Sequence, residues 1–313
     1  MKQTIPKKLA SGVVAAAMTL SLLPAAALAA DSEYSTSGAT GFAFTDSGIA
    51  AEDGSYTGYK ISGTDLTIQD SGTYIVSGNC SDGSITIKKG TTGVTLVLDG
   101  LTLTSEDTAP IACNKSSEVK IVAASGTGTL NITANGKNGI KSGATTADEG
   151  EASLTIRGLT LNITAPVNDA INAEQTLNIE SGTLNISAGD DAIHCDYVMN
   201  VGASGTTGPS ITIKACYEGL EAATLNILSG NISILSEDDC LNAANSDLTG
   251  YSFSMTISGG AITAYSSTGD GFDSNGDLTI TGGTVVVWTA NTADDQPLDA
   301  DGTLTVSGGT VLA

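Results

Sequence analysis

The chain has 313 residues, a net charge of −22 and only 4% aromatic residues. A surface this acidic repels nucleic acid and anionic lipid headgroups and attracts cations, so we expect no nucleic-acid partner. High acidity with few aromatic residues is also typical of disordered chains, but dense Val, Ile, Leu and Thr patterning is not. The 38 Gly and 6 Pro suit many short strands joined by tight turns.

The N-terminal residues have the pattern of a secretory signal peptide. Lys2, Lys7 and Lys8 precede an apolar run at 12–23, and Ala27-Leu28-Ala29 provides a small-x-small cleavage site. Residues 1–29 are therefore predicted to be a signal peptide, and the protein to be secreted to the extracellular space. The apolar run is shorter than the ~20 residues that a membrane-spanning helix needs, so no membrane insertion is expected. Residues 30–58 are rich in Ser, Gly, Thr and Asp and are predicted to form a leader or N-terminal cap.

Five cysteines show no metal-binding spacing: Cys80, Cys113, Cys195, Cys216 and Cys240. An odd number in an exported chain leaves at least one thiol unpaired. We expect most of them to be small buried side chains, and a bridge is not deducible.

Apolar and polar residues alternate from residue 63 onward, which is the period of a strand with one buried face. The first expected strands cover 65–68, 72–76 and 84–87, and 94–103 and 118–122 continue the pattern. After Thr127 the strands repeat in pairs that are separated by Ser-Gly or Gly-Gly corners. One apolar hinge position recurs at separations of 22, 27, 21, 31 and 26 residues, at Ile171, Ile193, Leu220, Leu241, Phe272 and Leu298.

Periods of this length predict a solenoid, and three short strands with corners fill one turn of a parallel β-helix. Residues 59–313 are therefore predicted to form an all-β, right-handed parallel β-helix, because strand-crossover-strand connections are right-handed. Leucine-rich repeats are disfavoured because no helix-forming arc is present, and antiparallel sandwiches because two-residue hairpin turns are scarce. The sequence stops within a strand pattern at 309–313, so further C-terminal coils are expected. A monomer is expected.

Several Asn residues begin Asn-x-Ser/Thr triplets, at Asn114, Asn131, Asn162, Asn185 and Asn231. These triplets are potential glycosylation sites. In a strand repeat, however, we favour outward-facing Asn and Thr side chains that bond along the stack.

Aligning the coils on the hinge shows two columns of polar residues in the turns. Two places before the hinge lie Asn138, Asp169, Asp191, Glu218, Asp239, Asp270 and Gln296. One place after it lie Lys141, Asn172, His194, Glu221, Asn242, Asp273 and Asp299. Equivalent residues of a β-helix stack about 5 Å apart, and carboxylates so spaced need a cation or raised pKa values.

Calcium is the predicted cation, because it takes six to eight oxygen ligands from flexible sites. The predicted ligands are Asp190, Asp191, Glu218, Glu221, Asp238, Asp239, Asn242, Asp270, Asp273 and Asp299. Magnesium resists dehydration, and zinc is disfavoured because the chain has a single His. The alternative is a solvated acidic edge that prevents strands from pairing between molecules.

A second candidate feature is an apolar strip close to the acidic turns. Leu235, Tyr265 and Trp288 each lie five residues after a corner glycine, with the parity of outward-facing residues. Sugar rings stack on such strips, whereas the alternative is mutual packing under a loop. His194, Lys214, Tyr265 and Trp288 are the candidate ligand-binding residues.

The turn motifs resemble those of a known family. Gly269-Asp270-Gly271-Phe272-Asp273-Ser274-Asn275-Gly276 and Glu218-Gly219-Leu220-Glu221-Ala222 are similar to turns of the clostridial cellulose- and polygalacturonate-binding β-helix family, the carbohydrate-binding domain-containing proteins. Asp191-Ala192-Ile193-His194 and Val94–Gly100 support the resemblance, which covers roughly 60–313. It implies a secreted β-helix with calcium in its acidic turns that binds acidic plant-wall polysaccharide such as pectin, and kinship with polysaccharide lyase family nine pectate lyases.

Three functions fit these residues. A binding protein would hold acidic sugars through calcium and aromatic stacking. A calcium-dependent pectate lyase also needs a Lys or Arg base, and Lys214 is the only one from Asp190 to the end of the sequence. With this single candidate base we favour binding of polygalacturonate or cellulose over an enzymatic function. The third function is an adhesin-like surface spacer with structural calcium.

Overall fold

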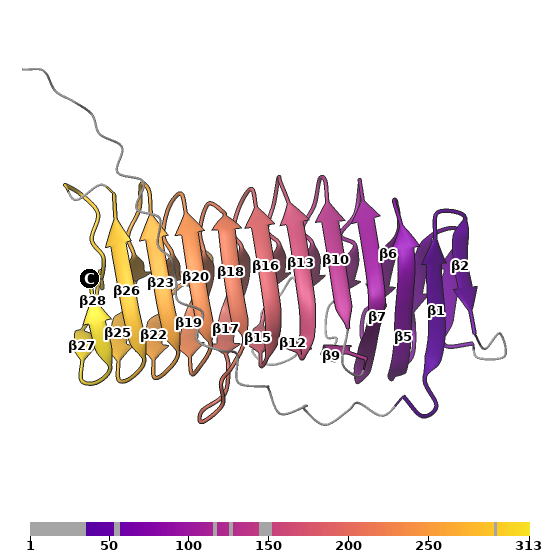
Figure 1. The fold of residues 1–313 in the computed structure, drawn as a ribbon, viewed down its shortest axis with the longest axis horizontal. Coiled ribbons are helices and arrows are strands. Elements are labelled where there is room, and N and C mark those ends of the chain that lie inside the picture. The colour runs from indigo at the N-terminus through magenta and orange to yellow at the C-terminus, as the bar shows by residue number, and fades with distance from the viewer. Residues whose placement is uncertain (1–35, 53–56, 115–117, 125–127, 144–151, 291–292) are drawn as a thin grey trace, which may run out of the picture. The chain divides into compact units, whose positions relative to one another are not determined.

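The computed structural model describes residues 36–52, 57–114, 118–124, 128–143, 152–290 and 293–313. All regular structure in these residues is β: 28 strands coil into a solenoid of about nine turns with mostly parallel pairing (Figure 1). The prediction of an all-β parallel β-helix is confirmed. The predicted signal peptide lies outside the described residues. Within the described ranges, no apolar helix of membrane-spanning length occurs.

Three ladders of strands make up the solenoid, and each coil contributes to them in turn. The first ladder contains β4 (Asp65–Ile68), β6 (Ser84–Ile87), β8 (Ile111–Cys113), β11 (Ile140–Ser142), β14 (Ile171–Ala173), the starts of β17 (Ile193–Val201) and β19 (Leu220–Ile227), β21 (Leu241–Ala243) and β24 (Phe272–Ser274).

The second and third ladders run alongside it. The second contains the starts of β5 (Gly72–Cys80) and β7 (Val94–Ser105), then β9 (Glu118–Ala123), β12 (Ser153–Arg157), β15 (Thr176–Ile179), the ends of β17 and β19, β22 (Ser254–Ile257), β25 (Asp277–Ile280) and β27 (Leu304–Val306). The third contains the ends of β5 and β7, β10 (Thr129–Ala134), β13 (Leu159–Ala165), β16 (Gly182–Ala188), β18 (Ser210–Ala215), β20 (Asn231–Ser236), β23 (Ala261–Ser266), β26 (Thr284–Thr289) and β28 (Thr310–Leu312). Strand β1 (Thr40–Thr45) pairs with Tyr74–Gly78 of β5, where the second ladder passes into the third.

Two antiparallel pairs lie at the N-terminal end of the described solenoid. Strand β2 (Gly48–Ala51) pairs with β1, and β3 (Tyr59–Ser62) pairs with β4. The rings of Phe42 and Tyr59 pack edge to face there, with centroids 4.8 Å apart. Strand β1 also pairs in parallel with β5, so part of the segment expected as a leader or cap already belongs to the solenoid.

The core is built from stacks of equivalent apolar side chains. The predicted hinge residues are register partners from coil to coil: Ile171, Ile193, Leu220, Leu241 and Phe272, all fully buried. Phe272 continues the stack through a bridge to Leu298. Burial of each such side chain contributes roughly 1.5–3 kcal/mol. Because these residues pair with one another from coil to coil, they fix the register of the turns that flank them.

Outward-facing asparagines form two hydrogen-bonded rows. In the third ladder Asn185 donates to Asn162, which donates to Asn131, at 2.8 and 2.7 Å. In the second ladder Asn226 donates to Asn200, which donates to Asn178, at 3.0 and 2.9 Å. The expectation that triplet asparagines bond along the stack is confirmed for Asn131, Asn162 and Asn185.

All five cysteines are buried with free thiols. Cys195 and Cys240 are fully buried, and burial raises the pKa of each thiol to about 12. They act as small core side chains, as predicted.

Candidate functional site

The acidic turns connect the third ladder to the first and stack in one column. Their backbones are bonded in register: Gly219 N donates to Asp239 O at 2.9 Å, Cys240 N to Asp270 O at 3.3 Å, and Gly271 N to Gln296 O at 2.9 Å. A Cβ at Gly271 would collide with the carbonyl of Pro297. The small residue between the two polar columns is therefore needed for the coils to approach.

Three carboxylates of the column cap the next coil. Asp169 accepts the backbone N–H of Asp191 at 3.2 Å, and Asp239 accepts that of Asp270 at 2.6 Å. Asp270 in turn accepts that of Gln296. These acids therefore already hold neighbouring turns together before any cation is considered.

The two polar columns meet in a cluster of three carboxylates at the Phe272 and Leu298 coils. Asp270, Asp273 and Asp299 each offer an oxygen, and these oxygens all lie within 4.8 Å of one another. Nearby, the buried Oδ2 of Asp295 has no hydrogen-bond partner among the described residues. The cluster offers oxygen ligands alone, which hard cations such as calcium prefer.

Several carboxyl groups in these turns have raised pKa values because they are buried and lie close to other carboxylates. Burial, reinforced by the charge of Glu221, raises the pKa of Glu218 to about 8. Burial also raises the pKa of Asp239 to about 7. Asp273 has a pKa of about 6 because of burial and the charges of Asp270 and Asp299. Near neutral pH Glu218 therefore holds a proton for most of the time and Asp239 for about half of it, whereas a nearby positive charge would favour the ionised forms.

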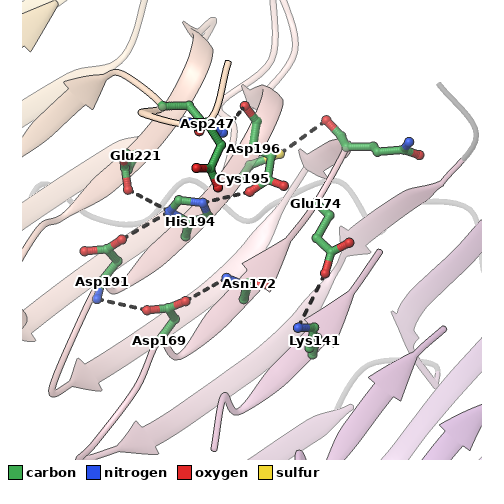
Figure 2. Close-up of polar contacts among 12 residues, drawn as sticks. Lys141, Asp169, Asn172, Glu174, Asp191, His194, Cys195, Asp196, Glu221 and Asp247 are labelled. Atoms are coloured by element: carbon green, nitrogen blue, oxygen red, sulfur yellow. Dashed lines mark hydrogen bonds and ion pairs between the residues drawn. The ribbon is translucent and has the colours of Figure 1, made fainter. Parts of the chain in front are cut away.

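A different arrangement surrounds His194, which precedes the Asp270 cluster by three coils (Figure 2). Its Nδ1 lies 2.6 Å from Glu221 Oε2 and 3.2 Å from Asp191 Oδ2. Its Nε2 lies 2.9 Å from Asp196 Oδ1. Asp191, His194 and Glu221 also satisfy the spacing of a metal-binding group.

The other predicted ligands are spread along the same turns. Asp190 is exposed, whereas Asn242 is 7% exposed and its Nδ2 donates to Glu218 Oε2 at 2.9 Å. The buried Oδ1 of Asn242 has no hydrogen-bond partner in the described part of the chain. A hydrogen bond to Asp238 raises the pKa of Tyr217 to about 12.

The predicted apolar strip is present on the third ladder. Leu235 pairs in register with Tyr265, and Tyr265 with Trp288. The rings of Tyr265 and Trp288 have centroids 5.7 Å apart at 46°, and Leu235 is 51% exposed. The strip lies a few residues before the acidic turns in the chain.

Lys214 lies in β18 at a bulge, where Ile186 pairs with Ile213 but Ser187 pairs with Ala215. The side chain is exposed and forms no ion pair with any residue that the structure describes. No contact among the described residues joins Lys214, a predicted ligand-binding residue, to the Asp270–Asp273–Asp299 cluster.

Three residues of this surface were missed by sequence reasoning. Asp196 follows His194 by two residues, which is the spacing of one strand face and the signal that could have found it. Asp295 precedes the aligned turn position by one residue. Tyr217, 44% exposed, stands between Asp190 and Asp238 through backbone bonds of 2.9 Å each. No repeat pattern marks it, because the equivalent residues are acidic.

Two comparisons with known proteins found a similarity. A similar solved structure is that of the polysaccharide lyase-like protein from C. thermocellum, studied as a gadolinium derivative. It is 21% identical, with a TM-score of 0.48, over 87% of this chain and 100% of that chain. A search of curated proteins found no match. The family model of carbohydrate-binding domain-containing proteins matches residues 62–313, and the chain therefore belongs to that family.

Proposed function

We propose that this protein is a secreted, calcium-dependent binding protein for acidic polysaccharide, of which polygalacturonate is the test case. Membership of the carbohydrate-binding family supports a polysaccharide partner. The observation that carries the finer proposal is the Asp270–Asp273–Asp299 cluster, whose turns follow the strands that carry the Tyr265–Trp288 pair.

Calcium fits the donor set of the cluster. Its ligands would be carboxylate oxygens of Asp270, Asp273 and Asp299, and the unpartnered Oδ2 of Asp295 would be a further one. Burial raises the pKa values of Asp270 and Asp273, and the repulsion between neighbouring carboxylates raises them further. A bound divalent ion supplies the opposite charge, so the carboxylates stay ionised.

The net charge of −22 makes the cation a requirement for this class of ligand. An anionic polysaccharide is repelled by an acidic surface, unless a divalent ion joins carboxylates on both sides. The faces of Tyr265 and Trp288 then provide apolar area for sugar rings. Leu235 extends this strip along the third ladder.

The direct test is affinity for polygalacturonate in the presence of calcium and in the presence of a chelator. We expect binding with calcium, loss with the chelator, and loss in Asp273→Asn. The matched control is Asp99→Asn, which removes one exposed carboxylate of β7 far from the cluster in sequence. Binding of Asp273→Asn at the strength of the control would contradict the proposal.

The same assay separates the other functions. A rise in ultraviolet absorbance from unsaturated products, lost in Lys214→Ala, would show a lyase instead. Binding that ignores both the chelator and Trp288→Ala, or absence of any binding, would favour a spacer. Secretion is tested separately, by sequencing the N-terminus of the exported protein, where cleavage after Ala29 is expected.

A further inference from the structure

The imidazole of His194 is surrounded by carboxylates from two coils. Asp191 and Asp196 belong to its own coil, and Glu221 belongs to the next, where it is the register partner of His194. Figure 2 shows these oxygens on opposite edges of the ring. The side chain of His194 is 19% exposed, and those of Asp191 and Glu221 are 12% and 16% exposed. Solvent therefore screens this group only weakly.

With ionised carboxylates on both edges of the ring, the geometry favours a proton on each ring nitrogen. A neutral imidazole has one N–H, so its other nitrogen would face a carboxylate oxygen with no hydrogen between them. That would place two lone pairs at 2.6 or 2.9 Å, whichever tautomer is chosen. The imidazolium instead donates on both edges, which is the arrangement of a charge-assisted hydrogen bond.

The ligand atoms of Asp191, His194 and Glu221 lie close enough together to share one ion, but the shortest contact among them has the length of a hydrogen bond. Two ligands at 2.0–2.1 Å from one tetrahedral zinc lie about 3.3 Å apart, whereas Nδ1 and Glu221 Oε2 are 2.6 Å apart. This short separation is that of a hydrogen bond. The pKa of His194 points the same way, because burial lowers it but the bonds to the three carboxylates raise it further.

The equivalent positions of the two adjacent coils lack such a cation, and Lys141, one coil before Asn172, pairs with Glu174 instead. His194 pairs with Asn172 on one side and Glu221 on the other, and the column continues with Asn242 and Asp273. Among the described residues, no Lys, Arg or His forms an ion pair with the Asp270–Asp273–Asp299 cluster. The chain therefore neutralises the carboxylates between the Asp191 and Glu221 coils itself, whereas the Asp270–Asp273–Asp299 cluster depends on a cation from solution.

We propose that His194 is a built-in cation that takes the place of a metal ion between the Asp191 coil and the Glu221 coil. It joins the two coils and keeps divalent ions out of this step, so that they bind only at the far end of the column. The statement on His194 depends on its own contacts. The contrast with the Asp273 end rests on the proposed function.

The protonation state is tested on the wild-type protein, because His194 is the single histidine of the chain. Nitrogen-15 NMR of the metal-free protein at pH 7.5 is expected to show two protonated ring nitrogens. Addition of calcium or zinc is expected to leave both signals in place. A neutral tautomer would overturn the proposal, and so would a ring nitrogen that loses its proton to bound zinc.

The replacement of a metal is tested with His194→Asn, because Asn already occupies the equivalent place at 172 and 242. This variant leaves Asp191, Asp196 and Glu221 without a counter-charge. We expect a lower melting temperature than wild type in chelator, and one more bound calcium per chain when calcium is added. Lys89→Asn, which removes an exposed cation far from the column in sequence, should do neither. Unchanged calcium stoichiometry in a folded His194→Asn would overturn the proposal.

The two proposals fail separately. If Asp273→Asn binds calcium and polygalacturonate normally, the proposed function is wrong, while the NMR signature of His194 is unaffected. If His194→Asn does not fold, the NMR experiment on the wild type still decides the role of the imidazole.

Discussion

Glu218 allows the acidic column to be tested through the pH dependence of stability. Its carboxyl accepts a hydrogen bond from Asn242, and burial raises its pKa from about 4.5 to about 8. The native state therefore binds more protons than the unfolded state between these two values. Stability from this group is fully present below pH 4.5 and is lost as the pH rises to 8.

The size of the loss follows from the shift. Each pKa unit corresponds to 1.36 kcal/mol, so Glu218 alone lowers the free energy of unfolding by roughly 3–5 kcal/mol at pH 8.5. Glu218→Gln keeps the carbonyl that accepts from Asn242 and removes the charge. The variant should match wild type near pH 4.5 and exceed it by that amount at pH 8.5.

The assay is urea denaturation of the metal-free protein in chelator at pH 4.5, 6.5 and 8.5. Glu237→Gln is the matched control, because Glu237 is an exposed carboxylate of the next turn. Parallel pH profiles of wild type and Glu218→Gln would refute the reasoning, as would a variant that is less stable than wild type at pH 8.5.

Three further predictions concern the core, the asparagine rows and the aromatic strip. Phe272→Ala removes a fully buried ring, so urea denaturation should show a loss of about 3–5 kcal/mol. Asn162→Ala breaks two side-chain hydrogen bonds and leaves its row divided, for a loss of roughly 1–3 kcal/mol in the same measurement. Trp288→Ala should weaken polygalacturonate binding about tenfold or more in titration calorimetry, because one ring of the Tyr265 pair is lost.

Controls for these three variants use neighbouring side chains. Phe272→Leu should recover most of the stability, and an equal loss would mean that packing volume is not the cause. Asn162→Thr, which resembles residues elsewhere in the row, should be milder than Asn162→Ala. Trp288→Phe should retain more binding than Trp288→Ala, and equal binding by all three proteins would exclude the strip as the sugar surface.

The register of the coils was predictable because backbone bonding forces equivalent residues to stack. One hinge position, from Ile171 to Phe272, sufficed to place the acidic columns, and the parity of Tyr265 and Trp288 placed the strip. The fold therefore followed from periodicity alone. The identity of the ions and of the saccharide does not follow from stacking and stays a proposal.

The repeat length could not predict how individual side chains are oriented in irregular segments. The bulge at Lys214 inserts one residue into the third ladder, which no repeat length could place. The segment after Ala243 reaches back two coils, where Asn245 Nδ2 donates to Asp196 O at 3.1 Å. His194 was predicted as a ligand-binding residue. Its hydrogen-bond partners could not be predicted from the sequence, because they depend on the side-chain conformations of three carboxylates.

The neighbour-only pairing of the coils has a consequence for how the molecule opens. An interior strand such as β16 is bonded on both edges, by β13 and β18, whereas β28 is bonded only by β26. In such one-dimensional arrays each interface contributes separately, so unfolding need not be concerted. Hydrogen exchange should therefore show amide protection that differs from coil to coil, because one coil can open while the others stay intact.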